Sequence, residues 1–481
     1  MNYKLVLRVT GFALLLEAVC LLLPTLVALI YGEALASFLW SILITAVVGA
    51  ALSLLLKGKT SNNLLPRDGF LTVGLIWTLF GVFGALPFRF SGLFGNFVNC
   101  FFECISGFTT TGSSILTAVE GLPYGLLFWR SFTNWLGGMG VLVLTAALLP
   151  SLGINSNFLI RAESPGPVKS KLVPRASQSS KILYTIYLAL TVIEVPLLRL
   201  TGLPWYDAIV AAFSTAGTGG FSIKNASIGG YGNPAAEIII TVFLILFSIN
   251  FAMYFLLLTR RFKQVLQSDE LRFFLCVVVV ATAAITVNIA PTFERVGPAL
   301  RAAAFQVASI ISTAGFATVD FNLWPEFSKM LLVVLMLVGA CAGSTGGGMK
   351  CSRILVLLRS ARREIRSIIH PRSVSVVRLD GEPLAEQTVK TTQSYFIIYI
   401  FLIFAAALVV GIDDFSFGTT LTAVISCVGN IGPGLEAVGP MGNFAGFSDL
   451  SKLVLAFCMV LGRLEMFPIL VLFSRNAWKK Q

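Results

Sequence analysis

The chain has 481 residues, of which 56% are hydrophobic and only 12% are charged. Because a soluble globular protein carries about 25% charged residues, this composition excludes a soluble fold and indicates an all-α polytopic membrane protein with no large soluble domain. The single histidine, His370, argues against acid–base or metal chemistry that depends on histidine.

The net charge of +12 at pH 7 would suit a nucleic-acid-binding protein, but the positions of the basic residues argue otherwise. When alternate loops are assigned to one side of a membrane, most lysines and arginines gather on that side. The opposite loops carry acidic residues, and the positive-inside rule makes the basic side cytoplasmic. We therefore predict no nucleic-acid partner, cytoplasmic termini and an even number of full spans.

The chain begins with two apolar stretches, near residues 5–31 and 35–56. A span takes about 20 apolar residues, so each of them is long enough to cross a bilayer. The first could be mistaken for a signal peptide, but the apolar run is too long and no cleavage site ends it. We predict that residues 1–60 form two N-terminal transmembrane helices.

After residue 60, a full span, a short apolar run, a glycine-bearing loop and a second full span occur in this order four times. The long stretches lie near 69–88, 125–150, 182–202, 235–258, 272–291, 329–358, 392–411 and 450–474. The short runs, near 94–108, 204–214, 298–312 and 415–428, are too short to cross a bilayer. A period of about 100 residues is typical of a duplicated membrane hairpin and not of a solenoid. We predict four repeats, at 61–160, 161–268, 269–378 and 379–481.

Each short run leads into a loop that contains a glycine. The residues of these loops are Thr110, Thr111 and Gly112; Thr218, Gly219 and Gly220; Thr313, Ala314 and Gly315; and Asn430, Ile431 and Gly432. Irregular backbone at membrane depth is tolerated where it lines a cavity or is buried in protein, so we expect the four loops to meet at one pore. Their carbonyl groups could replace the water around a cation, and the absence of carboxylates favours a monovalent one. The alternative is that the glycines only allow close helix packing.

A second glycine-rich segment interrupts the predicted span at 329–358. Its candidate functional residues are Gly343, Ser344, Thr345, Gly346, Gly347, Gly348 and Lys350. Glycine costs about 1 kcal/mol per helical residue, so we expect a loop inside the membrane, below the four other loops. The spacing of Gly343 and Gly348 is that of a phosphate-binding loop, but Met349 separates Gly348 from Lys350 and no strand precedes the segment. A cluster of glycines that serves only packing is a further alternative.

Two arginines lie in apolar sequence. A charged side chain within a span is a functional candidate by default, so we expect Arg463 to face the pore or the 343–350 segment unless it extends to the membrane surface. Arg130 could be an interfacial anchor or could stabilise the first loop. The basic segment 350–378 could contact anionic membrane lipids or an acidic regulatory subunit.

Together with the four loops, four longer motifs closely resemble the Trk/Ktr potassium-uptake family. They lie at residues 130–140, 164–169, 343–350 and 462–465, and the two additional N-terminal spans fit the TrkH-type branch best. The resemblance implies four membrane–pore loop–membrane repeats around a pseudo-fourfold pore in the bacterial inner membrane. It also implies a K⁺ pathway with one filter glycine per repeat, namely Gly112, Gly220, Gly315 and Gly432.

The resemblance further implies that the 343–350 segment is a gate, with Lys350 repelling K⁺ and Arg463 beside it. It implies a homodimer that binds a cytoplasmic nucleotide-binding regulatory ring of the TrkA type, and no organic cofactor in this chain. The predicted function is therefore channel-like K⁺ uptake. A Na⁺- or H⁺-coupled secondary transporter, which would also use broken helices, is the alternative, whereas a membrane enzyme is disfavoured because catalytic side-chain clusters are missing.

Overall fold

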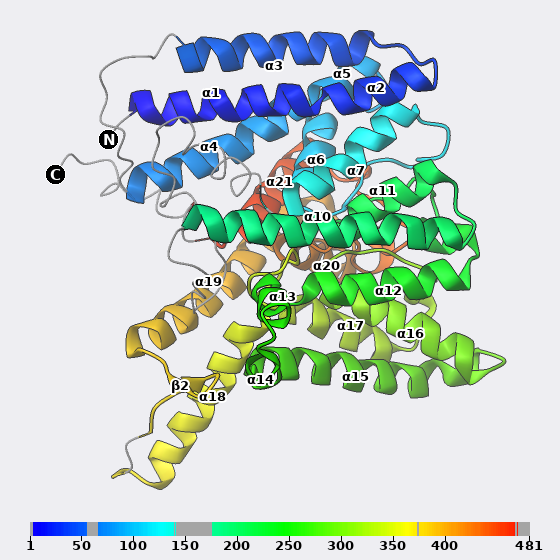
Figure 1. The fold of residues 1–481 in the computed structure, drawn as a ribbon. Helices are drawn as coiled ribbons and strands as arrows, with labels where there is room; N and C mark the ends of the chain where they lie inside the picture. The colour runs from blue at the N-terminus through cyan, green and yellow to red at the C-terminus, as the bar shows by residue number, and fades with distance from the viewer. Residues whose placement is uncertain are drawn as a thin grey trace.

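The computed structural model of the chain describes residues 3–54, 66–138, 140, 176–372, 375–466 and 469. Several predictions lie outside these residues: the motif at 164–169, the second half of the span at 125–150, the end of the span at 450–474 and the location of the two termini. The predicted repeat boundaries stay predictions. The regular secondary structure of the described residues is helical apart from one short hairpin (Figure 1).

The N-terminal helices pack together at one side of the molecule. It consists of α1 (Tyr3–Cys20), α2 (Leu22–Ile30) and α3 (Ala36–Leu54), and α1 and α3 run side by side (Figure 1). Gly11 of α1 and Gly49 of α3 meet at the crossing, where a Cβ added at Gly11 would lie 2.8 Å from the Gly49 carbonyl oxygen. The absence of a side chain at this point therefore allows the two backbones to touch.

The remaining helices surround the four that correspond to the predicted short runs. The surrounding helices are α4 (Pro66–Gly84), α5 (Leu86–Ser91), α7 (Tyr124–Gly138), α10 (Ala176–Leu200), α12 (Pro234–Ser248), α13 (Phe251–Leu258), α14 (Phe262–Leu266), α15 (Asp269–Ile289), α17 (Glu326–Val338), α18 (Cys351–Ile369), α19 (Glu386–Val410) and α21 (Asp449–Arg463). The short helices are α6 (Phe97–Phe108), α11 (Trp205–Ala216), α16 (Val296–Ile311) and α20 (Phe417–Gly429). The bounds of all four short helices agree with the predicted short runs to within a few residues.

Short elements complete the fold. The strands β1 (Arg378–Leu379) and β2 (Glu382–Pro383) pair antiparallel in a hairpin. Single turns of 3₁₀-helix follow or precede the main helices at η2 (Ser227–Tyr231), η3 (Ala290–Thr292), η4 (Phe321–Leu323), η5 (Gly411–Asp413) and η6 (Glu436–Val438).

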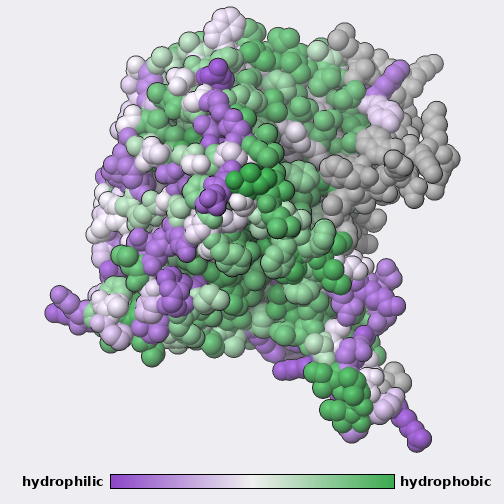
Figure 2. Space-filling model, turned by 180° about the vertical axis from the view of Figure 1, so that it is seen from behind, coloured by the Kyte–Doolittle hydropathy of each residue, from purple (hydrophilic) through white to green (hydrophobic). Residues whose placement is uncertain are grey.

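Six helical segments among the described residues are long and apolar enough to cross a membrane, or seven if the bent pair α12 and α13 forms one span. Their outer faces are apolar, as on α19, where Phe401 and Leu408 are exposed. Figure 2 shows hydrophobic side chains over a broad central area, with hydrophilic ones toward its edges. This apolar surface is therefore suited to contact with lipid.

Two predicted spans are broken. The stretch near 235–258 was predicted as one span, but α12 and α13 meet at 90°, because the Asn250 side chain accepts the Ala252 N–H (2.9 Å) and starts a new helix. The stretch near 329–358 is interrupted between α17 and α18, as its glycines predict. The two breaks meet, since the Phe251 N–H donates to the Gly343 carbonyl (3.0 Å).

The contact between α1 and α3 predicts that Gly11→Leu destabilises the fold. The new side chain would collide with the backbone of Gly49 and Ser53, and overpacking of this kind costs about 1–3 kcal/mol. We expect a lower unfolding temperature in detergent, followed by tryptophan fluorescence. Gly297→Leu is the matched control, because a Cβ at Gly297 meets no atom within 4 Å. Equal unfolding temperatures for the two variants would contradict the close approach.

Candidate functional site: a ring of four loops

The four short helices end in the same backbone motif. The residue after each helix, or after its first capping residue, has a positive φ, and these residues are Thr110 (56°), Thr218 (51°), Thr313 (63°) and Asn430 (55°). The N–H of the next residue then donates to a serine carbonyl in the last turns of the helix, at 2.8–2.9 Å in all four cases. This is the Schellman arrangement, which usually places glycine at the left-handed position. Threonine is uncommon there, so its surroundings must hold it in place.

The serines that accept these bonds were not predicted. They are Ser106, Ser214, Ser309 and Ser426, and each precedes its loop glycine by the same number of residues. Two of them also hold the loop through their side chains, since the Ser309 hydroxyl donates to the Phe316 carbonyl (2.6 Å) and the Ser426 hydroxyl to the Gly432 carbonyl (2.7 Å). The constant spacing from the glycine was a signal that could have revealed them.

The loops at 110–112, 218–220, 313–315 and 430–432, here called the first to fourth ring loops, meet in a closed ring. A Cβ added at the glycine of one loop would collide with the carbonyl oxygen of the middle residue of the next. The pairs are Gly112 and Gly219 (2.2 Å), Gly220 and Ala314 (1.9 Å), Gly315 and Ile431 (2.0 Å), and Gly432 and Thr111 (2.7 Å). The last pair returns to the first loop, so the four predicted filter glycines are brought together by contact.

Hydrogen bonds also join neighbouring loops on one side of the ring. The Ser113 hydroxyl donates to the Gly432 carbonyl (3.0 Å), the Gly229 N–H to the Ala317 carbonyl (3.0 Å) and the Glu436 N–H to the Asn322 side chain (2.9 Å). A polar cavity of about 130 Å³ opens on this side and is lined by the glycines of all four ring loops.

Hydrogen bonds from Ser416 and Thr419 hold the pKa of the Glu436 carboxyl below its usual value.

A buried ion pair lies behind the first ring loop. Arg130 of α7 donates to Glu103 of α6 at 2.6 Å, and the two side chains are 4% and 0% exposed. Glu103 also accepts the Ile115 N–H (2.9 Å), while Arg130 donates to the Ser222 carbonyl (2.9 Å) and lies over the Phe221 ring. Arg130 thus joins the segments that directly follow the first two ring loops, and because it is buried it is not an interfacial anchor. Glu103 was not predicted, although a carboxylate inside an apolar run is a signal of function.

The loop at residues 339–350, between α17 and α18, packs directly against the ring. The Gly347 N–H donates to the Thr313 hydroxyl (2.5 Å), and a Cβ at Gly347 would lie 2.5 Å from the Gly429 carbonyl oxygen. The Lys350 ammonium group donates to the Gly346 carbonyl within the loop. Because a helix precedes the segment, the phosphate-loop alternative fails here, whereas close packing by its glycines is observed together with contact to the ring.

Arg463, at the end of α21, joins the 339–350 loop to the first ring loop. Its guanidinium donates to the Thr345 carbonyl (2.9 Å), to the Thr110 hydroxyl (3.3 Å) and to the Gly137 and Gly138 carbonyls (2.5 Å each). The last two bonds satisfy carbonyls at the end of α7, which lack partners inside the helix. Arg463 therefore faces the 339–350 loop, as predicted, and does not extend to the membrane surface.

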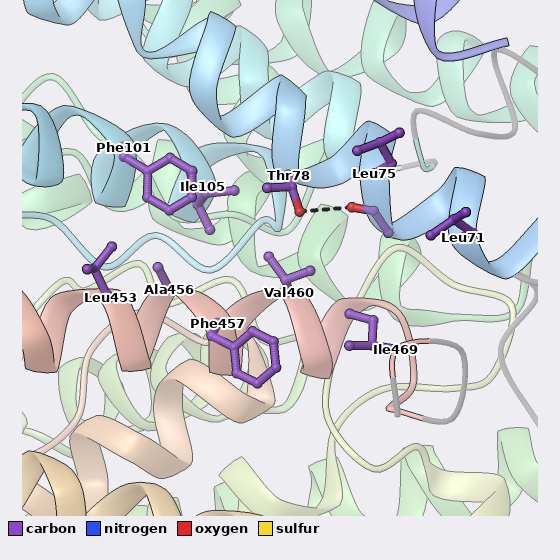
Figure 3. A pocket seen from close by; sticks show the side chains of 11 residues that line it. Leu71, Leu75, Thr78, Phe101, Ile105, Leu453, Ala456, Phe457, Val460 and Ile469 are labelled. Carbon is purple, nitrogen blue, oxygen red and sulfur yellow. Dashed lines mark hydrogen bonds between the residues drawn. The ribbon is translucent and has the colours of Figure 1, made fainter. Parts of the chain in front are cut away.

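A second cavity, of about 470 Å³, lies between α4, α6 and α21. Figure 3 shows Leu71, Phe101, Phe457 and other apolar side chains around it, and the Thr78 hydroxyl bonded to its own helix (2.9 Å). Since apolar walls cannot replace the water around an ion, this cavity does not extend the polar site at the ring.

Comparison with known proteins decides the family. Residues 35–480 match the TrkH family, described as a cation transport protein. The chain belongs to the TrkH family. It is 37% identical to the Trk system potassium uptake protein TrkH of Salmonella typhimurium over 100% of both chains, and 33% identical to the Trk system potassium uptake protein TrkG of Escherichia coli over 99% of both.

The fold agrees with that of a solved TrkH relative. The crystal structure of the potassium transporter TrkH from Vibrio parahaemolyticus superposes with a TM-score of 0.89 at 33% identity and covers 100% of both chains. The resemblance inferred from the sequence motifs is thereby confirmed. The helical polytopic fold is also confirmed, and TrkH-family relatives are named as transport proteins and not as enzymes.

The Glu103–Arg130 pair predicts a large effect of Glu103→Ala on stability. Removing one partner leaves a buried, uncompensated charge, which costs about 3–5 kcal/mol. Glu326→Ala is the matched control because Glu326 also pairs with a basic residue, Lys329, but is 83% exposed; such a pair contributes at most about 1 kcal/mol. Thermal unfolding in detergent measures both. A Glu103→Ala midpoint as close to wild type as that of the control would show that the pair does not stabilise the loops.

Proposed function

We propose that this chain takes up K⁺ across the bacterial inner membrane, with the ring loops as a selectivity filter of backbone carbonyls. The observation that carries the proposal is the closed ring, in which four glycine loops from distant parts of the chain touch one another in order. Membership of the TrkH family and the potassium uptake named for its relatives support K⁺ as the transported ion.

The ring suits a monovalent cation for electrostatic reasons. The twelve residues of the ring loops contain no carboxylate, so neutral oxygen dipoles would replace part of the hydration shell. Divalent cations prefer carboxylate ligands. The four short helices end at the ring, and the negative ends of their dipoles favour a cation nearby. The inside-negative membrane potential would supply about 2.3 kcal/mol per charge per 100 mV.

We also propose that the 339–350 loop is the gate. It contacts the third ring loop through Thr313 and the first through Arg463, and the positive charge of Lys350 would oppose the passage of K⁺. Displacement of this loop would open the pathway. The loop lies on the side of the ring where the short helices end, which is the cytoplasmic side if those helices enter from outside.

The family resemblance also leads to a proposal on assembly and regulation. We propose a homodimer that binds a nucleotide-binding regulatory ring of the TrkA type on the cytoplasmic side. The exposed arginines of α18, including Arg362 and Arg366, suit an acidic protein surface or anionic lipid.

The filter proposal predicts selective, uncoupled cation flux from purified protein in liposomes. We expect K⁺ and Rb⁺ to pass faster than Na⁺ and Li⁺, without a fixed stoichiometry to Na⁺ or H⁺. Gly315→Ala would push the third loop from the fourth, because a Cβ lies 2.0 Å from the Ile431 oxygen, and should lower the K⁺/Na⁺ flux ratio roughly tenfold. Gly297→Ala, in open space, is the control. A fixed stoichiometry of K⁺ to Na⁺ or H⁺ would return a coupled secondary transporter to first place.

The gate proposal predicts that Thr313→Val raises cation flux. Valine keeps the shape of threonine but leaves the Gly347 N–H without its acceptor, which costs about 1–3 kcal/mol in a buried position and favours displacement of the 339–350 loop. We expect flux several-fold above wild type. Thr420→Val is the matched control, because the buried Thr420 hydroxyl has no hydrogen-bond partner within the described part of the chain. Equal flux in the two variants would argue against a gate at this contact.

A further inference from the structure

The 339–350 loop is closed at its base by backbone contacts between its two ends. The Cys351 N–H donates to the Ala340 carbonyl (2.9 Å), and the Cys351 thiol lies 3.3 Å from the Gly339 carbonyl oxygen. We call this base the neck of the loop. Any displacement of the loop as a whole has to turn about the neck or separate its two sides.

Glu270, from the first turn of α15, bridges the neck. One carboxylate oxygen accepts the Ala342 N–H (2.7 Å) on one side and the Ser352 N–H (3.0 Å) on the other. The side chain is buried, with 8% of the residue exposed. Ser352 lies in the first turn of α18, where N–H groups lack partners inside the helix and the helix dipole favours a carboxylate. A single acidic group from another helix thus holds both sides of the neck.

The preceding residue, Asp269, binds both α18 and the hairpin that follows it in the chain. Its carboxylate accepts Arg359 of α18 (2.8 Å) and the Asp380 N–H of the hairpin (2.9 Å), and its own N–H donates to Asp380 (2.7 Å). Arg359 also donates to the Arg378 carbonyl (2.7 Å). Figure 1 shows α18 and the hairpin projecting from the helical body beyond the start of α15.

We propose that Glu270 is a positioning residue that keeps the neck of the 339–350 loop closed, and that the pair Asp269 and Glu270 transmits a displacement of α18 and the hairpin to this loop. Of these two adjacent residues of α15, Glu270 contacts the neck and Asp269 contacts α18 and the hairpin. A movement of α18 therefore strains the hydrogen bond between Ser352 and Glu270. The inference rests on the proposed function only in taking the loop as the gate. The chemical basis is the sharing of one carboxylate by two backbone N–H groups.

The native cysteines of the neck provide the test. Cys341 and Cys351 are 1% and 0% exposed, and Cys104, buried in α6 away from the neck, is an internal reference. The full-length protein is treated with a water-soluble maleimide, and the modification of each cysteine is followed by peptide mass spectrometry. Glu270→Ala should increase the labelling rate of Cys341 and Cys351 roughly tenfold, with Cys104 unchanged.

Companion variants separate positioning from general stability. Glu270→Gln keeps an acceptor oxygen and should restore much of the protection. Asp269→Ala should increase labelling of the neck cysteines to a smaller extent. Glu237→Ala is the matched control, because Glu237 also lies in the first turn of a helix and pairs with Arg301 (2.7 Å) away from the neck; it should leave the labelling pattern unchanged.

The outcomes distinguish this inference from the proposed function. Unchanged labelling in Glu270→Ala, or labelling of Cys104 in parallel with the neck cysteines, would overturn the positioning role. Unchanged labelling in Asp269→Ala would overturn the transmission. A wild-type protein that carries no cation flux, but whose Glu270→Ala variant still exposes the neck cysteines, would reject the proposed function and leave the role of Glu270 intact.

Discussion

The constraint on which the rest of the structure depends is the contact between each ring glycine and the next loop's carbonyl. No Cβ fits at any of these four positions, where added atoms would lie 1.9–2.7 Å from an oxygen. The glycines also have φ between 70° and 107°, which side chains disfavour. Both the lack of room for a Cβ and the positive φ therefore require glycine at these four positions. The rest of the molecule holds these four loops in contact with one another.

Holding irregular backbone among membrane-length helices requires that its polar groups find partners inside the protein. The structure meets this demand in layers. Serine carbonyls accept the loop N–H groups, the Glu103–Arg130 pair joins the segments that follow the first two loops, and the 339–350 loop bonds to Thr313. Arg463 then closes the first loop against the 339–350 loop. The proposed filter and gate thus share the side chains of Thr313 and Arg463.

Sequence reasoning succeeded where the signal is local. The short helices could be placed from apolar runs too brief to cross a bilayer, and the break at 339–350 from glycines that no helix tolerates in series. It failed at the 90° bend between α12 and α13, because the single polar residue Asn250 does not interrupt the apolar run on either side of it. Glu103 and Glu270 were also missed, since their partners Ile115 and Ala342 are identified by position in space and not by residue type.

The sequence by itself determined that this is a helical membrane protein, that four loops break its apolar pattern, and that their glycines lack charged neighbours suited to divalent ions. These properties follow from composition, spacing and backbone preference, which act over a few residues. Only the tertiary structure decided the order of the ring, the partner of each carbonyl and the hydrogen bonds of Glu270 at the neck of the 339–350 loop. Those contacts join residues up to several hundred positions apart, such as Gly432 and Thr111, and they exist only once the helices have packed.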